Sequence, residues 1–376
     1  MTRDISPPDR APDQAPGAPH PRETARLYGQ TSAESDFLSA YNAGRLHHGW
    51  LLHGPRGIGK ATLAWRIARF LLATPDGADD GLFGAPPAPE TLDIDPEHPV
   101  ARRISAEAEP GLAPITRSLN EKTNRMRDVI VVDDIRKLNR FFGLSATDGG
   151  HRVVIVDSAD EMNTSAANAL LKMLEEPPAR TTILLVSHQP SRLLPTIRSR
   201  CRGLRLSPLN AGDMQAALAA TGVTLPDNMD RLSALSAGSV GDALRLTNLG
   251  GLEIYGELVA ILNTLPGLDR PRALALAGAA AQRGASERFE LLLNLIDTVM
   301  TRLARTGATG IPPSPEAAPG EAQMLARLAP NPDRARAWAG IAATITARTR
   351  QGKAVNLDPA ALVLDTVFKM QETAAG

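Results

Sequence analysis

A glycine-rich segment between two apolar segments constrains the fold of this chain more than any other feature. Residues 54–60 read GPRGIGK and match the pattern G-x-x-x-x-G-K. The apolar run 50–53 predicts a buried strand before this segment, and the apolar spacing of residues 61–73 predicts a helix after it. Glycines at such a junction let backbone N–H groups face a phosphate, and the lysine pairs with its oxygens. The predicted phosphate contacts are Gly54, Gly57, Gly59 and Lys60.

The alternative interpretation of this segment is a glycine-rich turn with a chance lysine. The chain has only six lysines, and the strand-loop-helix context is the one that a phosphate loop requires, so we favour the phosphate loop. The next position departs from the pattern, because Ala61 stands where a Ser or Thr hydroxyl would hold Mg²⁺. Thr62 is no simple replacement, since one step along a helix turns a side chain by about 100°. Residues 61 and 62 remain candidates for nucleotide contact only.

Further strand and helix patterns predict an α/β domain with a mostly parallel sheet. Residues 152–157 (RVVIVD) and 182–187 (TILLVS) have the continuous apolar character of strands buried on both faces. Between them, residues 163–176 predict a helix with one apolar stripe, which Pro177-Pro178 ends. Strands alternating with helices imply parallel crossovers. Residues 203–206 predict a short last strand, whereas residues 74–127 predict irregular structure with one or two short helices.

The remainder of the chain divides by composition. Residues 1–22 carry six prolines among polar residues and predict a disordered leader. Strand patterns end near Pro208; from there only helical patterns follow, with a Gly- and Pro-rich loop at 307–320. We therefore predict the leader, a nucleotide-binding-type domain at 23–207, a small helical lid domain at 208–250 and an all-α domain at 251–376.

A carboxylate ends the predicted strand 152–157. Phosphate-loop proteins keep a Mg²⁺-binding Asp at this edge of the sheet, so Asp157 is a candidate nucleotide-site residue. The bland alternative is that Asp157 caps the following turn. Ser158 follows it, and the next acidic residues are Asp160 and Glu161.

Four segments resemble the subunits of bacterial sliding-clamp loaders, which are AAA+ proteins. They are 44–48 (GRLHH), 168–178 (NALLKMLEEPP), 197–201 (IRSRC) and 238–244 (GSVGDAL). The resemblance covers roughly 22–205 and is weaker at 238–244. It implies an AAA+ α/β domain with a parallel sheet, then a helical lid and a helical collar in which five subunits meet.

The resemblance also implies a division between ATP-hydrolysing motor subunits, tau and gamma, and the delta-prime class. This chain departs from the motor pattern at Ala61, at Ser158 in place of the water-activating Glu, and at Gly241 in place of the arginine that senses the γ-phosphate. By the same resemblance, Ser187 keeps the nucleotide-contacting position at the end of the predicted strand 182–187. Three losses that bear on one reaction favour a delta-prime type of subunit without hydrolysis, binding ATP or ADP at most.

By the same resemblance, Arg200 of the SRC motif enters the nucleotide site of a neighbouring motor subunit as an arginine finger. The alternative is a basic loop, because Arg192, Arg198, Arg202 and Arg205 lie nearby. The implied partners are the tau and gamma motor subunits, the delta subunit, and through them the β sliding clamp and primed DNA within the DNA polymerase III holoenzyme.

Two other functions stay open on the sequence alone. One is an active AAA+ ATPase, such as a divergent motor subunit, with Thr62 or water at the metal and Asp160 or Glu161 as the base. The other is a structural paralogue with an empty nucleotide pocket, against which Lys60 and the intact glycines argue.

Composition limits the partners, the cofactors and the cellular compartment that the sequence predicts. Lys+Arg and Asp+Glu both total 41, so net charge gives no bulk attraction to nucleic acid. The one cysteine, Cys201, excludes an internal disulfide and a four-cysteine zinc site, and fits a reducing cytoplasm. The zinc cysteines of many clamp-loader subunits are absent, so we predict no zinc. We find neither a membrane-spanning apolar run nor a signal sequence and predict a cytoplasmic protein.

Overall fold

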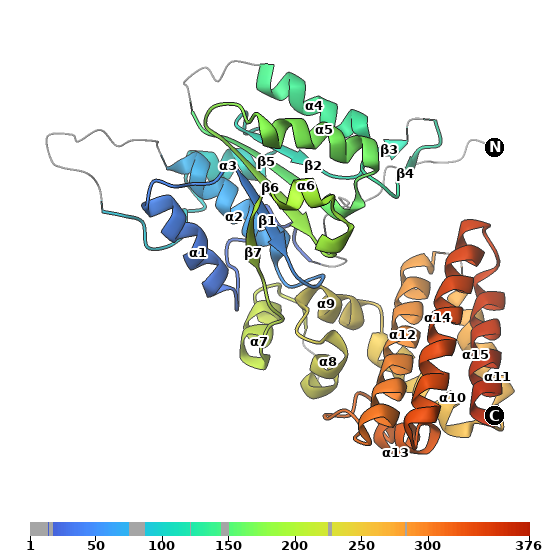
Figure 1. The fold of residues 1–376 in the computed structure, drawn as a ribbon. Helices are drawn as coiled ribbons and strands as arrows, with labels where there is room; N and C mark the ends of the chain where they lie inside the picture. Colours follow the sequence, from blue (N-terminus) through green and yellow to red (C-terminus); the bar gives the residue numbers. More distant parts are fainter. Residues whose placement is uncertain are drawn as a thin grey trace, which may run out of the picture. The chain divides into compact units, whose positions relative to one another are not determined.

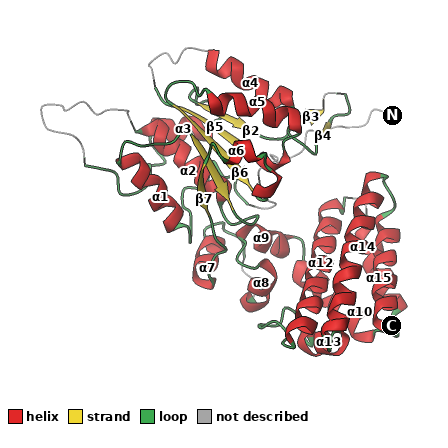
Figure 2. Cartoon of the chain, in the orientation of Figure 1, coloured by secondary structure: helices red, strands yellow, loops and turns green. Residues whose placement is uncertain are grey.

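The computed structural model describes residues 14, 18–74, 87–120, 122–143, 150–224, 228–282 and 284–376. The chain divides into two compact units, Met1–Thr221 with Gly238–Gly241, and Gly222–Ala237 with Asp242–Gly376. Every described strand lies in the first unit, and the second unit is helical over its described residues (Figures 1 and 2).

A five-stranded parallel sheet forms the centre of the first unit. Its strand order is β2-β5-β6-β1-β7, so the first strand of the chain lies inside the sheet, between two strands that follow much later. A separate antiparallel hairpin joins β3 to β4. The strands are β1 (Gly49–His53), β2 (Leu112–Ile115), β3 (Leu119–Asn120), β4 (Arg125–Met126), β5 (Arg152–Asp157), β6 (Thr181–Ser187) and β7 (Arg202–Arg205).

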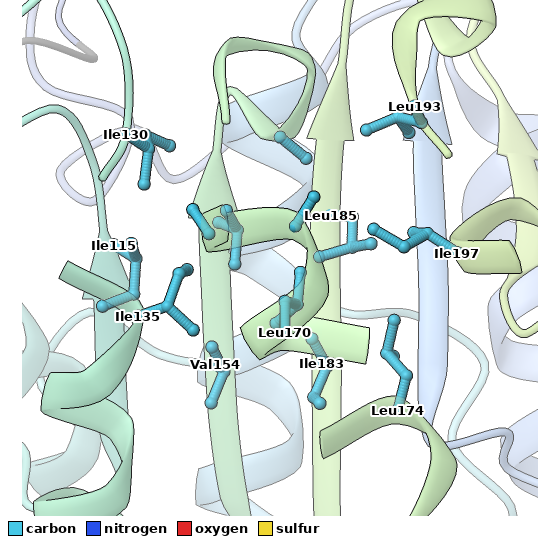
Figure 3. Packing of buried hydrophobic residues seen from close by; sticks show 14 of the residues in the cluster. Ile115, Ile130, Ile135, Val154, Leu170, Leu174, Ile183, Leu185, Leu193 and Ile197 are labelled. Atoms are coloured by element: carbon cyan, nitrogen blue, oxygen red, sulfur yellow. The ribbon is translucent and has the colours of Figure 1, made fainter. Parts of the chain in front are cut away.

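Helices cover both faces of this sheet. On one face, α4, α5 and α6 pack their apolar side chains against alternate residues of β1, β5 and β6, such as Leu51, Val154 and Ile183 (Figure 3). On the other face α2 lies across β1, β5 and β6. The helices of this unit are α1 (Thr31–Asn42), α2 (Lys60–Ala73), α3 (Pro99–Ser105), α4 (Val132–Gly143), α5 (Thr164–Glu175), α6 (Pro195–Arg198) and α7 (Ala211–Ala219). Two 3-10 turns are η1 (Ala159–Glu161) and η2 (Pro190–Arg192).

The second unit is built from antiparallel helix pairs around a core that includes the fully buried Trp338. Its longest helices, α12 and α14, pack against each other along their length, and α15 packs on α11 and α14. The helices are α8 (Met229–Ser236), α9 (Val240–Asn248, whose first two residues belong to the first unit), α10 (Gly251–Thr264), α11 (Arg270–Ala280), α12 (Ser286–Thr309), α13 (Glu321–Leu328), α14 (Pro332–Ala354) and α15 (Pro359–Ala375). None of the described helices combines the length and apolar character that a bilayer span requires.

The predicted α/β fold with a mostly parallel sheet, followed by helical segments, is confirmed. The helix predicted at 163–176 is α5, and the Asn163 side chain caps it by accepting a bond from the Ala166 N–H at 2.9 Å. The segment 208–250 holds α7, α8 and α9, but α7 clusters with the first unit and α8 with the second. A separate lid domain therefore stays a prediction, as do the other predicted domain limits.

Two predictions of irregular structure are wrong in part. Segment 74–127 contains β2, which is the edge strand of the main sheet, besides α3 and the β3–β4 hairpin. Its sequence, LAPI, hides it because proline lacks an N–H and is tolerated only at sheet edges. The predicted loop 307–320 begins later, since α12 runs to Thr309. Gly307 is a packing glycine: a Cβ there would lie 2.8 Å from Asn331 O.

The predicted disordered leader is also corrected where it is described. Residues 1–13 and 15–17 lie outside the described residues. Beyond them, His20 is buried and meets the Trp65 ring of α2 edge-on, with ring centroids 5.6 Å apart. The Arg69 guanidinium of α2 donates to Arg22 O at 2.7 Å. The end of the leader is therefore packed on the helix that follows the phosphate loop.

Candidate functional site

The predicted phosphate loop joins the carboxyl end of β1 to the amino end of α2. Because β1 lies between β6 and β7, the loop emerges from the interior of the sheet rather than from its edge. Gly59 is the N-cap of α2 and has a left-handed backbone, with φ of 98°. The first backbone N–H groups of the helix therefore follow directly on the loop, which is the arrangement that favours bound anions.

The glycines of this loop are required by their neighbours as well as by their backbone angles. Gly54, Gly57 and Gly59 have φ values of 146°, 68° and 98°. A Cβ on Gly54 would lie 2.5 Å from Leu206 O, and one on Gly59 would lie 2.5 Å from Leu27 Cδ1. At Gly57 a Cβ would collide with the Ser239 hydroxyl. Each of these three glycines therefore has both a backbone angle and a close neighbour that disfavour a side chain.

Lys60 is buried, with 3% of its surface exposed, and its ammonium bonds to carbonyls of its own loop. The Nζ donates to Gly54 O at 2.8 Å and also to Pro55 O. Burial lowers the pKa of Lys60 to about 8, against the opposing charges of Asp157 and Asp160. The lysine is therefore held in place with an ammonium that gives up its proton more readily than usual.

Ala61 and Thr62 occupy the first turn of α2, where both are half-buried. Ala61 offers no oxygen at the position whose hydroxyl binds Mg²⁺ in phosphate-loop ATPases. The structure brings Gly54, Gly57, Gly59, Lys60, Ala61 and Thr62 together in one loop and helix start, as the sequence predicts.

Asp157 ends β5 and Ser158 follows it, and a histidine that the sequence did not indicate contacts Ser158. The Ser158 hydroxyl donates to Asp157 Oδ1 at 3.1 Å and lies 2.9 Å from His188 Nε2. Burial, with the charges of Lys60 and Arg56, lowers the pKa of His188 to about 3, so the imidazole is neutral. Since the hydroxyl proton goes to Asp157, the Nε2–H of His188 donates to Ser158. Ser158 and His188 therefore form a neutral pair next to Asp157.

The two acidic residues that could act as a substitute base are engaged with other groups. Asp160 is buried and accepts from the backbone N–H groups of His188 at 2.9 Å and Gln189 at 3.2 Å. Glu161 pairs with Arg56 at 2.8 Å and with Arg117 at 3.1 Å. Both carboxylates therefore already have partners within the protein.

Ser187 ends β6 and lies opposite His53 in the register with β1, one residue before the phosphate loop. The side chain is fully buried, and its hydroxyl has no hydrogen-bond partner among the residues that the structure describes. The Nδ1 of His188 is a second buried atom without a partner there. Buried polar atoms without partners are uncommon, and a bound ligand, ion or water is one way in which they are satisfied.

Two further contacts that the sequence did not suggest fix the loop. The buried Gln30 side chain donates to Ile58 O at 3.2 Å and to Ser207 O at 2.7 Å. The Gly241 N–H donates to Gly57 O at 3.0 Å, and a Cβ on Gly241 would lie 2.9 Å from Gly57 Cα. An arginine at position 241 would therefore force this segment away from the loop. No pattern in the sequence indicates these backbone contacts.

Arg200 lies near the amino end of β1, whereas the phosphate loop follows the carboxyl end of that strand. Its carbonyl oxygen is 3.0 Å from an ideal Cβ on Gly49, the first residue of β1, whereas the loop begins after His53, the last. Four residue steps of a strand separate the two ends by roughly 13 Å. The guanidinium is partly exposed and pairs with Glu175, the last residue of α5, at 2.9 Å. Arg200 is therefore apart from the other predicted site residues.

The described residues contain no group of three or more His, Cys, Asp or Glu that could hold a metal ion. Cys201 follows Arg200 and packs against the apolar core below α5 and α6. Burial raises the pKa of its thiol to about 12, so it stays protonated.

Comparisons with known proteins place this site in context. Residues 29–210 match the family model described as DNA polymerase III, delta subunit. DNA polymerase III subunit delta' of Pseudomonas aeruginosa is 38% identical over 216 residues, which are 56% of this chain and 59% of that protein. DNA polymerase III subunit gamma/tau of Mycobacterium bovis is 27% identical over 332 residues, which are 79% of this chain and 52% of that protein. The aligned part is less than two thirds of either relative.

Among solved structures, a DNA polymerase III gamma subunit-related protein from Thermotoga maritima matches with a TM-score of 0.44 and 18% identity. The match covers 90% of this chain and 100% of that one. The family match and the delta' relative confirm the resemblance of this chain to delta-prime subunits that its motifs predict.

Proposed function

We propose that this chain is a non-hydrolysing, delta-prime-like subunit of the DNA polymerase III clamp loader, working in the cytoplasm. It would lie between a tau or gamma motor subunit and the delta subunit and help to load the β sliding clamp onto primed DNA. Polymerase activity would belong to the holoenzyme and not to this chain. The names of the matched family and relatives support this assignment.

The observation that carries the non-hydrolysing role is the bonding around the phosphate loop. Ala61 has no hydroxyl for Mg²⁺, and the place of the water-activating carboxylate is taken by Ser158 with a neutral His188. The alternative base Asp160 accepts two backbone N–H groups. ATP hydrolysis needs a bound metal and a group that orients the attacking water, and this arrangement supports a chain that lacks both.

The site nevertheless fits the phosphate chain of ATP or ADP. Lys60 and the glycines of the loop would hold the phosphates, and the unpartnered hydroxyl of Ser187 supports a contact at the end of β6. Asp157 would face the same region from the end of β5. Binding would then serve the stability or position of the subunit rather than chemistry.

The location of Arg200 supports a role in trans. Its side chain lies at the amino edge of the sheet, away from its own phosphate loop, so it could act only on the nucleotide of another subunit. A guanidinium placed there would neutralise charge that develops on the transferred phosphoryl group.

Steady-state ATP hydrolysis by the purified chain tests the non-hydrolysing role. With Mg²⁺ and primed DNA, we expect turnover at background, unchanged by Lys60→Ala because no catalytic group depends on that lysine here. The Lys60→Ala variant also exposes contaminating ATPase. Robust turnover that Lys60→Ala abolishes would instead assign the chain to the active AAA+ ATPases.

The lowered pKa of Lys60 predicts a pH dependence of nucleotide affinity. Only the ammonium form pairs with phosphate, and the free protein loses that proton above pH 8. Affinity for a fluorescent ADP should therefore fall above this pH by up to about tenfold per unit. Lys60→Arg keeps its charge throughout, so the decline should vanish in that variant. Equal pH profiles for the two proteins would contradict the assignment.

A further inference from the structure

A second cation stands in the phosphate loop besides Lys60. Arg56 follows Gly54 and Pro55, and two thirds of its side chain is exposed (66%). Its Nη2 contacts Glu161 Oε1 at 2.8 Å, and the other oxygen of Glu161 contacts Arg117 Nε at 3.1 Å. One carboxylate on η1 thus binds two guanidinium groups beside the loop, and among the described residues neither group has an ion pair with a carboxylate of its own.

The charge of Arg56 affects the pKa of two groups near the phosphate loop, Lys60 and His188. Burial is the main cause of the low pKa of Lys60, and repulsion from Arg56 adds to it. Burial is again the main cause for His188, with Lys60 and Arg56 both adding. The contacts agree with this: Arg56 binds Glu161, the adjacent Asp160 accepts from the His188 N–H, and Lys60 lies four residues after Arg56. Like charges placed together disfavour the free protein, and an anion between them would relieve this.

The carboxylates that could bring a metal to this region already accept bonds from the protein. Asp157 accepts from Ser158, Asp160 accepts from two backbone N–H groups, and Glu161 binds the two guanidinium groups. Ala61 contributes no ligand. The positive charge opposite a bound phosphate chain must then come from side chains of the chain itself.

We propose that Arg56 takes the charge-neutralising place of Mg²⁺ in this loop, so that the site binds a nucleoside diphosphate or triphosphate as the metal-free anion. The guanidinium exchanges Glu161 for phosphate oxygens, which its planar fork can meet with two bonds. Lys60 supplies the second charge from the buried side. This inference rests on the proposed function only in that it takes the phosphate loop as a nucleotide site.

Equilibrium titration with fluorescent ADP, in Mg²⁺ and in EDTA, tests the proposal. We expect the Kd of the unmodified chain to agree within about twofold in the two buffers. Arg56→Gln should weaken binding in EDTA by about tenfold or more, because a charge-assisted bond is lost. Arg56→Lys should lie between the two. The side chain is exposed, so these variants should keep the thermal unfolding midpoint of the unmodified chain.

The matched control is Arg336→Gln, the same change at an exposed arginine of α14 that pairs with the exposed Asp333. It should leave the Kd unchanged. Three results would each overturn the proposal. They are a Kd that Mg²⁺ lowers tenfold or more, an Arg56→Gln variant with the Kd of the unmodified chain, and no ADP binding in either buffer. The non-hydrolysing role is tested separately, because only ATP turnover would overturn it and this experiment measures binding.

Discussion

Replacing Arg200 with alanine is expected to lower ATP hydrolysis by the assembled clamp loader by a factor on the order of 10³ or more. The reason is the loss of a guanidinium that compensates charge on the phosphoryl group of a neighbouring subunit. The chain itself should fold normally, because the Arg200–Glu175 pair is partly exposed and such pairs contribute about 0–1 kcal/mol. The measurement is DNA-stimulated ATP turnover of a complex reconstituted with the motor and delta subunits.

Arg198→Ala is the matched control for this experiment. Arg198 ends α6, two residues before Arg200, and is exposed, so its loss changes local charge without removing the proposed finger. Arg200→Lys tests geometry, since an ammonium keeps the charge and loses the fork. If Arg200→Ala and Arg198→Ala lower turnover equally while assembly is intact, Arg200 belongs to a general basic loop and the finger assignment is wrong.

Glu321→Ala is expected to destabilise the second unit by about 3–5 kcal/mol. Glu321 is 1% exposed and lies at the start of α13. Its carboxylate accepts from Arg302 Nε at 2.7 Å, from the Tyr255 hydroxyl at 2.5 Å and from the Ala317 N–H at 2.6 Å. Burial, together with the charge of Glu321, raises the pKa of Tyr255, so that hydroxyl stays a donor. Alanine would leave the largely buried Arg302 guanidinium without its carboxylate, with only the carbonyls of Ala234 at 3.4 Å and Pro315 at 3.3 Å as acceptors, and would remove the acceptor of the other two donors.

Urea denaturation followed by circular dichroism measures this effect. Asp333→Ala is the control, because its pair with Arg336 is largely exposed and should contribute little. A double change, Arg302→Met with Glu321→Leu, should recover most of the lost stability, since it removes the unpaired charge as well as the acceptor. A Glu321→Ala variant as stable as Asp333→Ala would mean that water reaches Arg302 readily and that the network contributes no more than a surface pair.

The phosphate-loop region was readable from the sequence because its determinants are local. The glycines, Lys60 and the helix that begins there lie within one short segment, and each has a backbone or charge requirement of its own. The same holds for α5, where Asn163 caps the start and Pro177 marks the end. Such signals can be recognised in the sequence because they do not depend on contacts with distant segments.

Other parts depended on contacts between distant segments. β2 became a strand because it pairs with β5, although its own residues, with Pro114 among them, give little sign of it. Gly307 reads as a loop residue, yet it lies inside α12 because α14 approaches closely there. His188 was overlooked because only the folding of β5 beside β6 brings it to Ser158.

The sequence by itself thus determined the strand-loop-helix unit, the parallel α/β character and the absence of a hydroxyl at Ala61, since all three follow from residue type and short-range order. Only the tertiary structure decided which groups lie around the phosphate loop, and where Arg200 lies. Sheet order places β1 next to β6, so that the carboxyl ends of β5 and β6 lie on the same side of the sheet as the phosphate loop. Arg200 lies near the amino end of β1, on the opposite side. Pairing between strands far apart in the chain sets those distances, and no local pattern encodes them.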